Sequence, residues 1–235
     1  MFYFDEINGK KVLKSDLLNG IEHFFTTRET IIKTKEPDMK ALVEENKKLI
    51  CDYLKIKELI HPSQTHSANI DFAQTGKFVY PETDGLILNN KEQAIFLNFA
   101  DCTPVILYDI KQKIGAISHA GWRGTAQKIA PKTVEKMNSN PKDIIAVIGP
   151  AISLCCYEVG EEVFEQLKAT VNNFDGLHNG KKVDLKGINA RQLKEIGVEK
   201  IDICPYCTCC NNDLFFSYRK ENGTTNRHSA VLKLS

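Results

Sequence analysis

Short apolar runs, separated by polar or glycine-containing segments, recur through the middle and the end of the chain. Runs of this length that are rich in β-branched and aromatic residues are typical of strands buried in a sheet. They predict strands at 21–27, 69–72, 85–88, 94–99, 105–108, 114–118, 144–148, 200–203, 214–218 and 229–234.

A period of 3.6 residues indicates helices elsewhere. Apolar residues recur at this period after Pro37, and proline suits the first turn of a helix. Further helices are predicted at 125–137, with Thr125 as its cap, at 161–169 and at 185–196. Pro131 lacks a backbone N–H, so the helix over 125–137 either kinks or begins late.

The order of these elements favours an α+β fold. Strands outnumber helices and do not alternate strictly with them, as they would in a doubly wound sheet. The chain carries no internal repeat, low-complexity tract or Ser/Gly-rich linker. We therefore expect residues 1–235 to form a single domain, a layered sandwich of mixed β-sheets flanked by helices.

Composition excludes some classes of partner. The 235 residues include 31 Lys and Arg against 30 Asp and Glu, so bulk charge gives no attraction to nucleic acid or to an anionic membrane. No apolar run is long enough to span a bilayer, and the N-terminus does not resemble a signal peptide. We expect a cytoplasmic protein whose 8 cysteines are reduced. The sequence carries no signal for its oligomeric state.

Three separate segments each carry a side chain suited to zinc. His66 follows Gln64-Thr65, Cys102 follows Ala100-Asp101 where one predicted strand gives way to the next, and His119 precedes Ala-Gly-Trp-Arg-Gly. Two imidazoles and a thiolate leave the fourth tetrahedral position of a zinc ion open, as in catalytic sites. The sequence therefore predicts a catalytic zinc centre at His66, Cys102 and His119.

Each of these residues also has a simpler interpretation. A lone cysteine is most often a small buried hydrophobic residue, and a loop histidine is most often solvated. Arg123 offers a forked cation for phosphate or carboxylate, whereas Trp122 can stack on a base or anchor the core. Arg28 leaves a strand beside two threonines and is either a phosphate ligand or a surface charge.

The cysteine-rich segment 204–210 contains C-x-x-C but no second pair at zinc-ribbon spacing. Adjacent Cys209 and Cys210 are poorly placed to bind one ion together. The pattern favours packing over metal binding here, and the same interpretation applies to Cys155-Cys156.

Several blocks resemble the laccase-domain family, once labelled multicopper polyphenol oxidases. They are Ala100-Asp101-Cys102-Thr103-Pro104, His119-Ala120-Gly121-Trp122-Arg123-Gly124-Thr125, Ile148-Gly149-Pro150-Ala151-Ile152, Cys155-Cys156-Tyr157-Glu158-Val159-Gly160 and Phe216-Ser217-Tyr218-Arg219. The resemblance runs from about Thr26 to the C-terminus. It departs from the family at Ser67 and Asn226, where a glycine is usual, and at Glu29-Thr30-Ile31, where glycines usually follow T-T-R.

The resemblance implies a purine nucleoside phosphorylase with adenosine deaminase activity, with a nucleoside and phosphate as partners. It implies zinc at the three ligands named above and phosphate or substrate at Arg28. Cys102, Arg28 and Asp101 are then the expected catalytic residues, with Asp101 as proton shuttle or orienting group. Arg28, Arg123 and Gln64 are the expected substrate-binding residues. Adenosine, inosine, guanosine and methylthioadenosine are candidate substrates.

Two alternatives stay open, and one is excluded. Cys102 with His119 as base would make a cysteine hydrolase or deamidase, including one that edits peptidoglycan. A zinc-stabilised binding module without activity is the other alternative. Laccase chemistry needs roughly ten imidazoles for its copper centres, whereas this chain has 6 histidines and no H-x-H pair.

Overall fold

A computed structural model describes residues 1–57, 59–77 and 79–235, and it contains two six-stranded sheets. The first sheet has the order β1-β2-β3-β14-β7-β4, with β1 Phe2–Ile7, β2 Lys10–Ser15, β3 Glu22–Thr26, β14 His228–Lys233, β7 Ala94–Phe99 and β4 Leu59–Ile60. The second has the order β13-β10-β8-β9-β6-β5, with β13 Lys200–Ile203, β10 Ile144–Ile148, β8 Thr103–Asp109, β9 Ile114–Ala120, β6 Gly85–Leu88 and β5 Ile70–Phe72. Both sheets mix parallel and antiparallel pairs.

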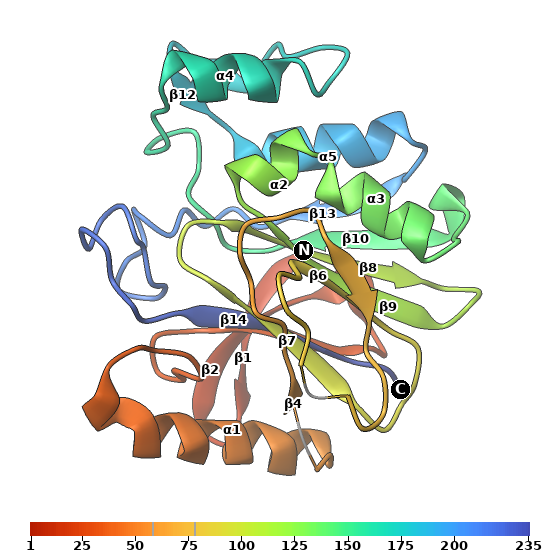
Figure 1. Cartoon of the computed structure of the whole chain (residues 1–235), viewed down its shortest axis with the longest axis vertical. Coiled ribbons are helices and arrows are strands. Elements are labelled where there is room, and N and C mark those ends of the chain that lie inside the picture. Colours follow the sequence, from red (N-terminus) through yellow and green to blue (C-terminus); the bar gives the residue numbers. More distant parts are fainter. Residues whose placement is uncertain (58, 78) are drawn as a thin grey trace.

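Helices cover the outer faces of the two sheets (Figure 1). The helix α1 Lys40–Leu54 lies on the first sheet, and the helices α2 Trp122–Ala126, α3 Ile129–Lys136, α4 Glu161–Lys168 and α5 Leu185–Glu195 gather on the side of the second. Short 3-10 turns at Asp16–Leu18, Pro37–Met39 and Pro141–Asp143 and a small hairpin, β11 His178–Asn179 with β12 Lys182–Val183, complete the elements. The predicted α+β sandwich of mixed sheets is confirmed.

The core follows from the period of two along each strand. Phe24 and Phe25 are neighbours in β3, so their side chains point to opposite faces of the sheet. Phe25 packs with Leu97 and Ile117 in the apolar layer between the sheets. Phe24 packs instead with Ile50 on the inner side of α1. Each face of the first sheet therefore has its own apolar cluster.

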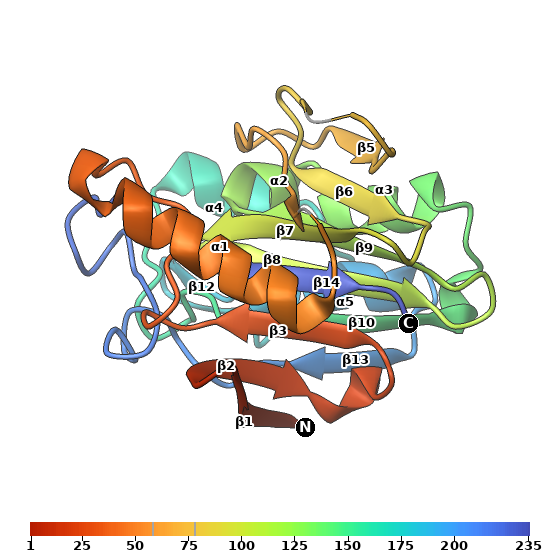
Figure 2. The same ribbon diagram turned by 90° about the horizontal axis from the view of Figure 1, so that it is seen from below.

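The C-terminal strand lies in the middle of the first sheet. β14 pairs antiparallel with β3 on one side and with β7 on the other, as Figure 2 shows from below. Residues from both ends of the chain thus share one sheet, in agreement with a single domain, which stays a prediction. No helix in the described ranges is long and apolar enough to cross a membrane.

An N-terminal hairpin is the main element that the sequence interpretation missed. β1 and β2 pair antiparallel across the turn at Asn8-Gly9, where both residues have positive φ. Asn-Gly is a strong hairpin signal. Most of β1 is exposed at the sheet edge, so its sequence lacks the apolar alternation of a buried strand.

The predicted helix over 125–137 is two helices. Lys128 adopts a left-handed conformation with φ of 57° and separates α2 from α3. Pro131 is the third residue of α3, within its first turn, so the predicted late start is confirmed and no kink is needed. Thr125 lies inside α2 rather than capping a helix, and its hydroxyl donates to the carbonyl of Ala120 at 3.3 Å.

The predicted strand at 214–218 is wrong, because this segment forms turns. Its aromatic residues are buried although the segment pairs with no strand. Phe215 packs in the layer between the sheets, and Phe216 packs against Ile31 and Ala100. The Arg28 N–H donates to the carbonyl of Leu214 at 2.9 Å, which satisfies one backbone group of the segment. An apolar run was mistaken for a strand because burial alone does not specify backbone conformation.

Candidate metal centre

Two neighbouring strands of the second sheet and one loop bring the predicted ligands together at one end of the sheet. β8 and β9 are antiparallel, and Pro104 at the start of β8 lies opposite His119 near the end of β9. Cys102 directly precedes β8, in the short connection that crosses from the first sheet to the second. His66 reaches the same edge from the loop between β4 and β5.

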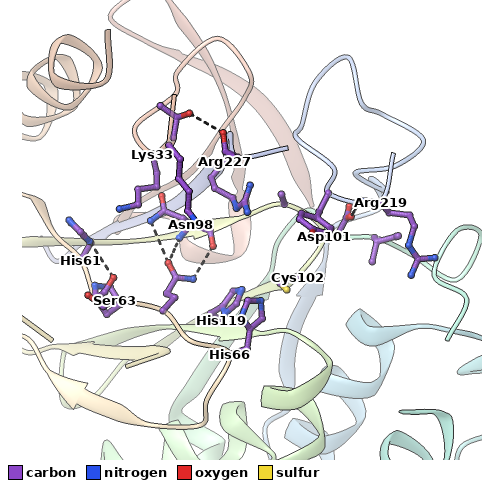
Figure 3. A pocket seen from close by; sticks show the side chains of 18 of the residues that line it. Lys33, His61, Ser63, His66, Asn98, Asp101, Cys102, His119, Arg219 and Arg227 are labelled. Carbon is purple, nitrogen blue, oxygen red and sulfur yellow. Dashed lines mark hydrogen bonds between the residues drawn. The ribbon is translucent and has the colours of Figure 1, made fainter. Parts of the chain in front are cut away.

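The ligand atoms of His66, Cys102 and His119 all lie within 4.8 Å of one another. The two imidazole rings are 4.9 Å apart between centroids, and the Cys102 sulfur points toward them (Figure 3). His119 is buried, whereas His66 is exposed and Cys102 is half-buried. The three side chains therefore converge at a place that is open to solvent on one side.

A buried carboxylate, Asp84, fixes the orientation of two ligands. The backbone N–H groups of Thr65, His66 and Ser67 donate to it at 3.0, 3.0 and 2.7 Å. The Ser67 hydroxyl adds a fourth bond at 2.8 Å, and His119 Nδ1 donates at 2.8 Å. Because Nδ1 is engaged, His119 Nε2 is the nitrogen left for a metal, the arrangement typical of zinc sites.

The same carboxylate holds an unusual backbone in place. His66 has a φ of 63°, in the left-handed region that residues other than glycine rarely adopt. The bonds to Asp84 on either side of this residue stabilise the loop in that conformation. Ser67, which stands where the family usually has glycine, contributes its hydroxyl to Asp84 and to the carbonyl of Glu82 at 2.9 Å.

The electrostatics favour a thiolate. Burial raises the pKa of Cys102, but the neighbouring His119 and His66 lower it to about 6. Burial lowers the pKa of His119, whereas Cys102 and Asp84 raise it to about 9. Asp84 is opposed by its own burial, yet hydrogen bonds from His119, Ser67 and Thr65 hold its pKa at about 2. A metal ion would take the place of the proton that His119 carries near Cys102.

Because Gly121 has no side chain, Cys102 and His66 can pack close to its backbone. A Cβ at this position would lie 2.8 Å from Cys102 Sγ and 3.3 Å from His66 Cδ2. Two nitrogens and one sulfur at this spacing, oriented by a carboxylate, fit zinc with a fourth position open. The donor set and its surroundings therefore match the predicted centre.

Gly121→Ala should weaken metal binding by about tenfold or more, because the added methyl displaces Cys102 Sγ from the shared position. The backbone itself accepts alanine, since φ is −66° and ψ is 177°. Titration of the metal-free variant with zinc measures the loss. Gly160→Ala is the matched control, because Gly160 also precedes a helix at φ of −72° and its Cβ would meet nothing within 4 Å. Equal affinity in both variants would contradict the packing argument.

The three candidate ligands line a cavity of about 650 Å³. Cations line it from separate segments: Lys33, Lys35, Arg219 and Arg227. In Figure 3, Lys33 and Arg227 lie on one side of Cys102 and Arg219 lies on the other. Tyr157 and Tyr218 add aromatic surface to the lining. The cavity thus combines positive charge with aromatic rings beside the candidate metal centre.

A family model described as "Multi-copper polyphenol oxidoreductase laccase" matches residues 25–235. The chain belongs to this family. It is 32% identical over 212 residues to the purine nucleoside phosphorylase YlmD of Bacillus subtilis, covering 81% of this chain and 76% of that protein. It is also 32% identical over 185 residues to the adenosine deaminase RL5 of an unknown prokaryotic organism, covering 70% of this chain and 71% of that protein.

Solved structures of family members share the fold. The crystal structure of YlmD from Geobacillus stearothermophilus superposes with a TM-score of 0.87 and 27% identity, over 98% of both chains. The Bacillus licheniformis hypothetical protein YfiH superposes with a TM-score of 0.88 and 29% identity, over 99% of both chains. The names of the relatives support an enzyme, and the geometry supports a metal site.

The laccase family name implies copper, but the remaining histidines form no further centre. Of the 6 histidines, two are the candidate ligands. Within the described ranges, none of His23, His61, His178 and His228 joins a group that could hold a metal.

Asp101 and Gln64 both line the cavity, with their polar atoms already engaged. Asp101 accepts hydrogen bonds from the Thr208 hydroxyl and from the Arg219 N–H, each at 2.7 Å. Gln64 donates to the carbonyl of Asn98 at 2.9 Å and accepts from its N–H at 2.8 Å. Gln64 thus extends the hydrogen bonding of β7, and its role in substrate binding stays a prediction.

Arg28 and Arg123 lie outside the set of side chains that line the cavity. Arg28 pairs with Glu221 at 2.8 Å and stacks over Phe216 at 4.3 Å. Arg123 is exposed at the start of α2 and stacks over Trp122 at 4.3 Å. Their predicted roles with phosphate or substrate stay predictions.

Sequence reasoning missed Asp84 and the cations of the cavity. Asp84 stands in Thr83-Asp84-Gly85, which resembles an ordinary turn before a strand. Arg227 comes close to Lys33 because its N–H donates to the Lys33 carbonyl at 3.2 Å. Arg219 belongs to the Phe216-Ser217-Tyr218-Arg219 block, which carried the resemblance and was the available signal.

Proposed function

We propose that this protein is a zinc-dependent purine nucleoside phosphorylase that also deaminates adenosine. The observation that carries the proposal is the convergence of His66, Cys102 and His119 beside a cavity lined by cations. The names of its relatives support the same activities. A cytoplasmic location and adenosine, inosine, guanosine and methylthioadenosine as substrates belong to the same proposal.

The chain's own residues prepare the zinc site. Asp84 holds His119 and the His66 loop, and the imidazoles favour the thiolate form of Cys102. A bound zinc ion would lower the pKa of a water molecule from ~15.7 to about 7, which supplies the nucleophile that deamination needs. The exposed side of His66 leaves access for the nucleoside.

The cavity has the size and chemistry for a nucleoside and phosphate. Its volume of about 650 Å³ lies within the roughly 300–1,000 Å³ of small-molecule sites. Tyr157 and Tyr218 offer rings on which a purine can stack. Arg227 and Lys33 lie together on one wall and offer positive charge to phosphate. We assign phosphate binding to this wall.

Asp101 handles a proton in this proposal. Two hydrogen-bond donors hold its carboxylate, and the residue lines the cavity next to Cys102 in the chain. A carboxylate in that place can accept a proton from the nucleophile and return it to the leaving nitrogen. Arg28 then acts indirectly. Its ion pair with Glu221 fixes the segment that carries Tyr218 and Arg219.

Purified protein loaded with zinc should convert adenosine to inosine without phosphate. With phosphate present it should also release a free base and ribose 1-phosphate, measured by chromatography. Arg227→Gln should raise the KM for phosphate about tenfold, because a charged hydrogen-bond partner is lost, and leave deamination largely unchanged. Arg191→Gln is the matched control, because this half-buried arginine of α5 does not line the cavity. A zinc-loaded protein that turns over no nucleoside would contradict the proposal.

A second candidate function is a cysteine hydrolase or deamidase, including one that acts on peptidoglycan. The lowered pKa of Cys102 and the raised pKa of His119 support it, because they favour a thiolate–imidazolium pair. This dyad would not need His66. If His66→Ala loses zinc and nucleoside turnover together, the dyad is excluded. If it keeps full activity, the zinc enzyme is excluded.

A further inference from the structure

A second group of sulfur atoms lies away from the metal centre. We call Cys155, Cys156, Cys207 and Cys210 the four-cysteine cluster, and their sulfur atoms all lie within 4.8 Å of one another. Cys155-Cys156 follows β10, and Cys207-x-x-Cys210 follows β13. The C-x-x-C motif therefore has a partner pair after all, supplied from a position that sequence spacing does not reveal.

The spacing of the sulfurs fits a tetrahedral ion. Cys210 Sγ lies 3.5 Å from Cys155 Sγ and 3.4 Å from Cys156 Sγ. Zinc–sulfur bonds of about 2.3 Å place the corners of a tetrahedron ~3.8 Å apart, whereas a disulfide needs about 2.05 Å. All four cysteines are free thiols. The observed distances are those of ligands around a common atom and not of bonded pairs.

Two tight turns present the four thiols to one point. The N–H groups of Cys156 and Tyr157 both donate to the carbonyl of Ser153, at 2.9 and 3.0 Å, which brings the adjacent cysteines into one turn. The Asn211 N–H donates to the carbonyl of Cys207 at 2.8 Å, so Cys207 and Cys210 share a second turn. Such a C-x-x-C turn is a common half of a zinc site.

A backbone donor also points at the cluster. The Ser153 N–H donates to Cys207 Sγ at 3.4 Å, and such a hydrogen bond orients a sulfur ligand of a metal. A divalent ion at the centre of the cluster would offset the repulsion between four crowded thiolates.

Nearby cations offset the charge of such a site. Four thiolates around Zn²⁺ carry a net charge of about −2. The buried Lys186 Nζ donates to the carbonyl of Cys204 at 2.6 Å, Lys182 Nζ to that of Cys155 at 3.2 Å, and Arg219 Nη1 to that of Cys156 at 3.5 Å. Each ammonium or guanidinium is thereby held beside the cysteine segments, which reduces the cost of the excess negative charge.

We propose that the four-cysteine cluster binds a structural zinc ion, separate from the centre at His66, Cys102 and His119. Four thiolates in tetrahedral array select zinc or iron, and a site closed by four protein ligands is structural. The ion joins residues 54 positions apart in the chain.

This ion would fix two walls of the cavity relative to each other. The first cysteine pair is followed directly by Tyr157, which lines the cavity. The second pair lies next to Thr208, whose hydroxyl holds Asp101 at 2.7 Å. The ion would stabilise the native arrangement, because its site exists only in the folded chain.

Metal content measured by mass spectrometry on protein purified under reducing conditions tests the proposal. We expect two zinc ions per wild-type chain, one in His66→Ala and one in the double variant Cys155→Ser/Cys210→Ser. The double variant changes two exposed cysteines and keeps the buried Cys207. Its Tm should fall by about 5 °C or more. Cys209→Ser, outside the cluster, is the matched control and should keep both ions.

Cobalt substitution separates the two centres without an activity assay. In the His66→Ala background, cobalt should retain strong sulfur-to-metal charge-transfer absorption, which the added Cys155→Ser/Cys210→Ser changes should remove. One zinc per wild-type chain that His66→Ala eliminates, or unchanged zinc in the double variant, would overturn the proposal. Loss of zinc in Cys209→Ser would overturn this choice of ligands, and iron at the same cysteines would overturn the identity of the ion.

Discussion

Asp84→Asn should weaken zinc binding 10- to 100-fold, the usual effect of removing a carboxylate that orients a metal ligand. The asparagine keeps the shape of the side chain. Both carboxylate oxygens of Asp84 accept hydrogen bonds, and an amide nitrogen in place of one of them cannot accept any. The side chain of Asp84 is fully buried, so the N–H groups of the His66 loop would lose partners they cannot replace with water. His119 would also lose the acceptor that directs its Nε2 toward the ion.

The same variant should be markedly less stable. Removing one partner from a buried charged network costs roughly 3–5 kcal/mol, which corresponds to a Tm lower by about 10 °C. Zinc titration and thermal unfolding of the metal-free protein measure the two effects separately. Since the pKa of Asp84 is about 2, its contribution in the wild type is present above pH ~4 and is lost as pH falls toward 2.

Asp109→Asn is the matched control. Asp109 is also a buried carboxylate, and it accepts bonds from the N–H groups of Lys111 and Gln112 at 2.8 Å in the turn between β8 and β9. This turn is at the opposite end of those strands from Cys102 and His119. We expect Asp109→Asn to lose stability but keep zinc affinity. Equal zinc affinity in both variants would show that Asp84 does not orient the ligands.

The free energy of unfolding should fall as the pH is lowered from about 6.5 toward 3, with His228 as the largest single cause. His228 is fully buried in β14, near the rings of Phe99 and Phe215. Burial lowers its pKa to about 3, against a smaller opposing effect of the Pro150 carbonyl. In the unfolded chain this imidazole binds a proton below pH ~6.5. In the native chain it binds one only below about pH 3.

The expected slope is up to ~1.4 kcal/mol per pH unit from this one residue. Urea unfolding at a series of pH values measures it. His228→Phe removes the titrating group, keeps an aromatic ring among aromatic neighbours, and should flatten the slope between pH 4 and 6.5. His23 and His61, whose pKa values burial also lowers, account for the slope that remains. Asp84 does not interfere, because its stabilisation is lost only below this window.

His178→Gln is the control for this experiment, because His178 is exposed in the small hairpin of β11 and β12. It should leave the slope unchanged. A slope that is the same in wild type and His228→Phe would mean that the native state accommodates a charged imidazole at this position.

The two candidate metal sites show how far sequence reasoning reached. Residue type together with the setting of each segment predicts His66, Cys102 and His119, since imidazoles and thiolates are the preferred ligands of zinc. The sequence pattern favours packing over metal binding for the residues of the four-cysteine cluster, because it offers no second cysteine pair at zinc-ribbon spacing. The second pair joins it through the parallel pairing of β10 with β13, which no local pattern specifies.

The fold divides in the same way. Buried strands such as β7 and β9 were predicted because apolar runs must be buried on both faces. The prediction of a strand at 214–218 was wrong, since Phe215 and Phe216 are buried by side-chain packing and not in a paired strand. The N-terminal hairpin was missed because an exposed edge strand carries little hydrophobic pattern, although Asn8-Gly9 marked its turn.

Local chemistry was thus sufficient for the family, for the layered α+β class and for three candidate ligands of one metal centre, because these depend on which residues are present and on short-range periodicity. Other contacts were decided only by the tertiary structure. Asp84 orients two of those candidate ligands, and two distant cysteine pairs meet. Arg28 pairs with Glu221 outside the cavity lining, whereas Arg227 is part of that lining. Such contacts depend on how strands pair across long stretches of sequence, and the free energy that selects one pairing is spread over the whole core.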